Sequence, residues 1–113
     1  MRGALALLVA LAAPAAADPL PPYPPAGCAA LWEAYADLFG DSGERALAAR
    51  FRDWSIRLDG EAATDAAIAE HRPMMTALIR AYVQDHDRQS RDLFERLVTE
   101  CGTAAGDLPG ETP

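Results

Sequence analysis

The sequence contains no lysine and only two cysteines, and each scarcity excludes a class of protein. Its ten basic residues are all arginines and oppose seventeen acidic residues, which gives a net charge of −7. Such a chain repels phosphate backbones and anionic lipid headgroups, so neither nucleic-acid binding nor binding to a membrane surface is expected. Two cysteines without a C-x-x-C-H run exclude covalent haem attachment, and a zinc site would need more cysteines and histidines at ligand spacing.

Sequence signatures of catalysis are also missing. No Gly-x-Ser-x-Gly nucleophile elbow is present, and the glycines occur singly instead of in a phosphate-binding loop. A domain of fewer than 100 residues leaves little room for the cleft that a pair of catalytic carboxylates requires. We therefore do not expect an enzyme.

Long apolar runs are missing after residue 13, and the run before it has the layout of an export signal. Met1–Gly3 is a short basic segment, Ala4–Ala13 is apolar, and Ala15–Ala17 supplies a small-x-small cleavage pattern. The apolar run is shorter than the about 20 residues of a membrane-spanning helix. We interpret residues 1–17 as a signal peptide, whose removal leaves a chain with a net charge of −8. The many alanines and the lack of lysine are typical of GC-rich bacterial genomes, so we expect a periplasmic or secreted protein without membrane insertion.

The rest of the chain divides into an arm, a domain and a tail. Residues 18–27 include five prolines and predict an extended arm, which serves either as a spacer or, through Tyr23, as a ligand for an aromatic groove. Residues 28–102 predict one helical domain, with Gly102 as the end of its last helix. Residues 103–113 lack an apolar period and predict a disordered tail.

Within the domain the apolar residues recur at the helical spacing of three to four, and no run alternates as a β-strand does. The first predicted helix is Cys28–Phe39, which Gly40 ends. The second is Glu44–Asp59, which Gly60 ends, and a third begins near Ala62. The connection between the first two helices is short, so they should be antiparallel neighbours.

Large apolar side chains on these helical stripes form the predicted core. A domain of this size has few such side chains, so most of them should be substantially buried. They are Trp32, Tyr35, Phe39, Phe51, Trp54, Leu78, Tyr82, Leu93, Phe94 and Leu97.

Pro73 lies inside the third helical pattern and allows two arrangements. Proline lacks a backbone donor and clashes with the preceding turn, so it either kinks a helix or starts a new one. In the arrangement that we favour, the third helix is kinked at Pro73 and ends in the polar stretch Asp85–Ser90. In the alternative, a helix ends at His71 and a last helix of about 43 Å continues to Cys101.

The two cysteines lie on apolar stripes at opposite ends of the predicted domain. An even number of cysteines in an exported chain predicts a disulfide, here between Cys28 and Cys101. A lipid anchor on Cys28 is disfavoured because this residue lies fifteen positions beyond the apolar run. The first and last helices bring their cysteines to one end only when the number of helices is even. The predicted fold class is therefore all-α: a small, disulfide-stapled, up-and-down bundle of about four helices with a kink or break near Pro73.

One small cluster of residues could bind a metal ion. His71 lies three and four residues before Met74 and Met75, and imidazole with thioethers suits copper. Methionines at helical spacing are more often core residues, so we assign no metal and no cofactor here.

Two functions remain as hypotheses. The first is a non-enzymatic accessory or stress-related module that binds an unknown protein or peptide partner. The alternative is a carrier of a small ligand or of copper that uses the histidine–methionine cluster. The oligomeric state cannot be predicted from these residues.

Overall fold

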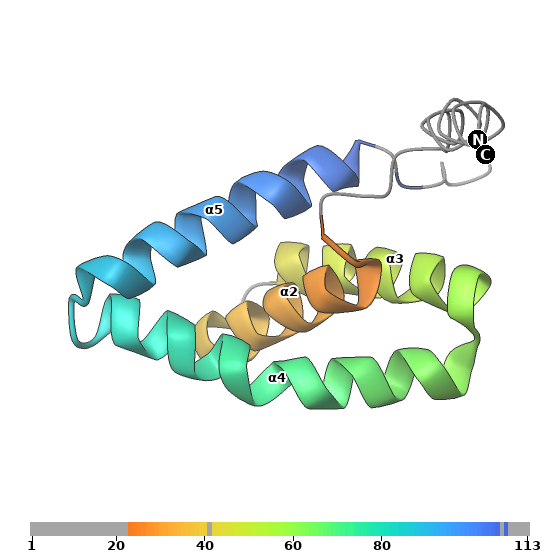
Figure 1. Cartoon of the computed structure of the whole chain (residues 1–113), viewed down its shortest axis with the longest axis horizontal. Helices are drawn as coiled ribbons and strands as arrows, with labels where there is room; N and C mark the ends of the chain where they lie inside the picture. The colour runs from red at the N-terminus through yellow and green to blue at the C-terminus, as the bar shows by residue number, and fades with distance from the viewer. Residues whose placement is uncertain (1–22, 41, 107, 109–113) are drawn as a thin grey trace, which may run out of the picture.

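The computed structural model describes residues 23–40, 42–106 and 108. The predicted signal peptide, most of the proline arm and the end of the tail lie outside this part of the chain. The described residues form helices and no strands, which confirms the predicted all-α class. Consecutive helices run in opposite directions (Figure 1), as in an up-and-down bundle. The helices are α2 (Pro25–Phe39), α3 (Ser42–Asp59), α4 (Glu61–Val83) and α5 (Arg88–Ala105).

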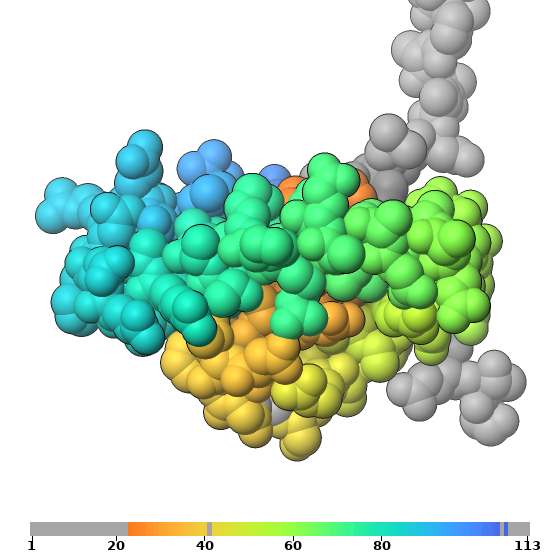
Figure 2. Space-filling model, turned by 90° about the horizontal axis from the view of Figure 1, so that it is seen from below, coloured from red at the N-terminus to blue at the C-terminus, as the bar shows by residue number. Residues whose placement is uncertain are grey.

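Helix α2 lies at the centre of the fold because its first half is small and apolar on all sides. All seven residues from Pro25 to Leu31 are buried, and four of them are alanine or glycine at positions 26, 27, 29 and 30. Small side chains let neighbouring helices approach closely, and a helix that is apolar all round belongs in a core. Seen from below (Figure 2), α4 crosses the molecule and the C-terminal part of α2 emerges beneath it, next to α3.

Glycines end the first two helices as predicted. Gly40 and Gly60 have φ angles of 68° and 90°, which favour glycine over other residues. The Gly40 N–H donates to the Ala36 carbonyl oxygen at 2.6 Å and so closes the last turn of α2.

Two predicted boundaries were wrong. Helix α2 begins at Pro25 and not at Cys28, because proline fits the first helical position, where no N–H donor is needed. Helix α5 passes through the exposed Gly102 and ends at Ala105. Leu108, in the predicted tail, is buried against the core, so the folded unit is longer at both ends than expected.

Pro73 lies inside α4, which supports the favoured arrangement and excludes a helix that ends at His71. The proline is exposed, so water can reach the backbone carbonyl whose partner it removes, and α4 changes direction near its middle in Figure 1. The break between α4 and α5 falls at residues 84–87. There the Asp87 carboxylate accepts a hydrogen bond of 2.8 Å from the Ser90 N–H and caps α5.

The predicted core is only partly confirmed. Phe51, Leu78 and Leu97 are buried, whereas Phe39 and Leu93 are 47% and 41% exposed, and their prediction was wrong. The remaining aromatic residues of the predicted set are half-buried: Trp32, Tyr35, Trp54 and Phe94, which pack against the core, and Tyr82. Helical periodicity identifies the apolar face of a helix but not how much of that face another helix covers.

Polar contacts join the helices beside the core. The hydroxyls of Ser55 and Thr64 form a buried hydrogen bond of 2.8 Å between α3 and α4. Arg72 on α4 donates to Glu33 at 2.8 Å and to Asp37, one turn further along α2. These contacts fix α4 against α2 and α3.

The disulfide joins α2 to α5 across 73 residues of sequence, with a Cα–Cα distance of 5.6 Å between Cys28 and Cys101. Both cysteines are fully buried. Within the described residues, none of the helices is both long and apolar enough to cross a membrane.

Candidate functional site: an aromatic groove

The candidate site is a groove on the side of α2 that the bundle leaves open. Helices α3 and α5 flank α2 but, within the described residues, do not pack extensively on each other. A hollow of about 350 Å³ lies between them. We call it the aromatic groove, and it is lined by Trp32, Tyr35, Glu44, Leu47, Phe94 and Val98.

Ring contacts connect the walls of the groove. The Tyr35 ring lies 6.2 Å from Trp32, 4.7 Å from Phe39 and 6.3 Å from Phe94, measured between ring centroids. Tyr82 continues the series at 5.4 Å from Phe94. Packed rings of this kind fix one another's orientation, so the groove has a rigid aromatic floor.

The floor of the groove, Trp32 and Tyr35, belongs to an aromatic stripe along α2 that continues to Phe39 beyond the groove. Trp32, Tyr35 and Phe39 have the spacing i, i+3, i+7, which places them on one face of the helix. They extend over about 10 Å at 1.5 Å per residue. Helices α3 and α4 pack on α2, whose buried residues include Ala30 and Ala34. Helix α2 therefore has apolar residues on more than one side, and its aromatic stripe stays partly exposed.

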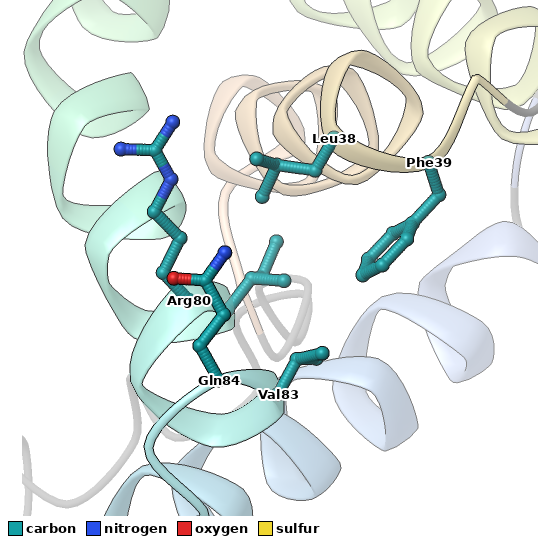
Figure 3. Close-up of a pocket in the computed structure, with 6 residues that line it drawn as sticks. Leu38, Phe39, Arg80, Val83 and Gln84 are labelled. Atoms are coloured by element: carbon teal, nitrogen blue, oxygen red, sulfur yellow. The ribbon is translucent and has the colours of Figure 1, made fainter.

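A smaller hollow of about 60 Å³ lies beyond Phe39, at the end of α2. Phe39 and Val83, on α2 and α4, both point into it (Figure 3). They are 47% and 43% exposed, so the apolar surface continues past the groove to this end of the molecule. Arg80 and Gln84 supply the polar edge of the hollow.

Few polar groups line the groove. Glu44 contributes a carboxylate at its α3 wall. The Trp32 Nε1 atom is buried and has no hydrogen-bond partner among the described residues. A buried donor without an acceptor costs about 1–3 kcal/mol, so this indole is held in place by packing and not by a hydrogen bond.

A second hollow of about 350 Å³ is polar and lies at the turn between α4 and α5. Tyr82, His86, Arg88 and Arg91 line it, and His86 has a φ of 53°. Acidic residues interrupt this basic segment at positions 85, 87 and 92, so its net charge is small. The Asp87 carboxylate is used in capping α5, and Ser90 lowers the pKa of Asp87 through a hydrogen bond to that carboxylate. This region is best described as a capped helix start.

The structure separates the side chains of the predicted histidine–methionine cluster. Met75 is fully buried in the core, whereas Met74 is 53% exposed. The His71 ring lies 6.3 Å from the ring of Tyr23 in an edge-on contact. Met75 therefore acts as a core residue, the usual role of methionine at helical spacing, and the two methionines lie in different environments. Among the described residues, no group of three or more His, Cys, Asp and Glu side chains could hold a metal ion.

Tyr23 belongs to the folded body. Its ring packs against the core and lies so close to Gly27 that a Cβ atom there would be 2.1 Å from it. Burial, with a smaller contribution from the Glu100 carboxylate, raises the pKa of the Tyr23 phenol. Tyr23 therefore fits neither alternative for the arm, since its ring is part of the folded body and not of a loose spacer or a free ligand.

No family model, curated protein or solved structure matches this chain. The function is accordingly inferred from the geometry of the groove.

The sequence identified the lining residues as apolar but not as a site. Trp32, Tyr35 and Phe94 belong to the predicted core, whereas Leu47 and Val98 line the groove without being in that set. One signal was available: the apolar residues of α2 cover more than one face, which is more than a closed bundle needs.

Proposed function

We propose that this protein is a small, exported, non-enzymatic module that binds a polypeptide segment in the aromatic groove. The observation that carries the proposal is the pairing of a half-buried tryptophan–tyrosine floor with apolar walls on α3 and α5. Tryptophan and tyrosine dominate the binding energy of protein interfaces. Contiguous apolar surface of this kind on a soluble protein commonly marks an interaction site.

Rigidity of the walls also supports binding. The groove's two long walls belong to helices that are far apart in sequence, and the disulfide ties α5 to α2 one turn from Trp32 and Val98. A preformed groove requires little ordering when a partner binds, which leaves more of the contact energy for affinity.

The proposed location is the periplasm or the exterior of the cell. The sequence layout of residues 1–17 supports it, and so does the disulfide, because reducing compartments keep most thiols free.

The test is binding of a fluorescent amphipathic peptide of 18 residues to the mature chain and to two variants, followed by fluorescence anisotropy. Val98→Asn places a polar group in the groove, and Leu58→Asn makes the same kind of change on α3 at a side chain that is 58% exposed. We expect Val98→Asn to weaken binding at least tenfold and Leu58→Asn to change it less than twofold. Equal affinities for the two variants would contradict the proposal, as would the absence of binding. Circular dichroism controls for the fold.

A further inference from the structure

We infer that the occupant of the aromatic groove is a cationic amphipathic helix from a partner protein, an inference that rests on the proposed function. It concerns the conformation and the charge of the bound segment, and each follows from a different property of the groove.

Conformation follows from the backbone groups that the groove lacks. Its walls are three helices, whose backbone N–H and C=O groups are already paired along each helix. An extended peptide gains its main-chain hydrogen bonds from a sheet edge, and no strand exists among the described residues. Buried in this groove, an extended segment would leave its backbone unsatisfied. A helix satisfies its own backbone and presents only side chains, so it fits an apolar groove between helices.

Spacing supports the same conclusion. The aromatic stripe Trp32, Tyr35 and Phe39, of which the first two residues form the floor of the groove, has the i, i+3, i+7 pattern with which one helix packs along another. A partner helix lying along α2 would place apolar residues at i, i+4 and i+7 over this floor. A hollow of about 350 Å³ at Trp32 and Tyr35 is large enough for one bulky apolar side chain of such a helix.

Charge distinguishes a foreign partner from a second copy. The chain carries a net charge of −7 and has no lysine, so two copies repel each other over long range. Glu44 adds a carboxylate to the groove wall itself. A partner helix with lysine or arginine beside its apolar stripe is attracted to this surface, and salt should weaken that attraction.

Four peptides test the inference by anisotropy on the mature chain. The first is an 18-residue leucine–lysine helix, and the second replaces each lysine with glutamate. The third has the composition of the first in an order without helical period. The fourth is the proline-rich sequence of residues 18–25. We expect the first peptide to bind at least tenfold more tightly than each of the others in 50 mM salt, and this preference over the glutamate peptide to shrink in 0.5 M salt. Glu44→Gln should reduce the preference, and Val98→Asn should weaken binding while Leu58→Asn does not.

The remaining outcomes separate this inference from the proposed function. Equal or tighter binding of the glutamate helix, still sensitive to Val98→Asn, would overturn the cationic partner and leave a peptide-binding groove. Equal binding of the aperiodic peptide, or tighter binding of the proline-rich peptide, would overturn the helical occupant. If every peptide bound and Val98→Asn weakened none of this binding, both proposals would be overturned.

Discussion

Reduction of the disulfide should destabilise the protein by an amount that its loop length sets. The bond closes a loop of 73 residues between Cys28 and Cys101. The chain-entropy model gives about 4 kcal/mol at 25 °C for a loop of this length. Small domains have a total free energy of unfolding of about 5–15 kcal/mol, so the reduced protein would lose a large part of its stability. For a domain of this size, that loss lowers Tm by about 15–30 °C.

Urea denaturation followed by circular dichroism at 222 nm measures this difference between the oxidised and the reduced protein. The double variant Cys28→Ala/Cys101→Ala should resemble the reduced protein and should not respond to reductant, which separates loss of the bond from other effects of the reagent. A difference below about 1 kcal/mol would refute the reasoning. It would mean that α5 is held to α2 by side-chain packing without help from the disulfide.

Three further predictions test the described burial and contacts with five substitutions. Ser55→Ala leaves the buried hydroxyl of Thr64 without its partner, so it should lower the free energy of unfolding by about 1–3 kcal/mol. Adding Thr64→Val to the same chain should recover part of that loss, which a double-mutant cycle measures. Phe51→Ala should cost about 3–5 kcal/mol because the ring is fully buried, whereas Phe39→Ala should cost less than about 1 kcal/mol; equal losses in urea denaturation would contradict the described burial. The pKa of Tyr23 is raised in the folded state, so its contribution to stability is present below the unfolded pKa of about 10 and is lost as pH rises through the folded pKa. Tyr23→Phe should therefore reduce the loss of stability in alkaline solution. An unchanged dependence of stability on pH would refute this role.

Local sequence patterns predicted most of the fold. Gly40 and Gly60 end helices at the expected positions, and the favoured arrangement, a helix that continues through Pro73, is the one in the structure. The parity of an up-and-down bundle predicted an even number of helices from the position of the cysteines, and the structure describes four. These features depend on residues close in sequence or on a covalent bond, which is why a single sequence contains them.

Features that depend on how far the helices diverge could not be predicted. Phe39 and Leu93 have the helical spacing of core residues, yet both are more than 40% exposed, because periodicity shows which face is apolar and not whether another helix covers it. The groove could not be predicted for the same reason. Val98 belongs to the same helical pattern of apolar residues as Leu97, but Leu97 is buried and Val98 is only partly buried. Packing of Tyr23 on Gly27 was equally unpredictable, because it depends on the direction in which the chain enters α2.

The most direct test of the central claim is an NMR titration that observes the two tryptophan indoles of the chain. Trp32 lines the aromatic groove, whereas Trp54 packs on Phe51, with ring centroids 6.4 Å apart, and does not line it. When the leucine–lysine helix is added to the ¹⁵N-labelled mature chain, the indole N–H resonance of Trp32 should shift progressively and that of Trp54 should stay in place. A shift of Trp54 without Trp32, or saturating binding that leaves both resonances unmoved, would show that the peptide binds elsewhere and would contradict the account.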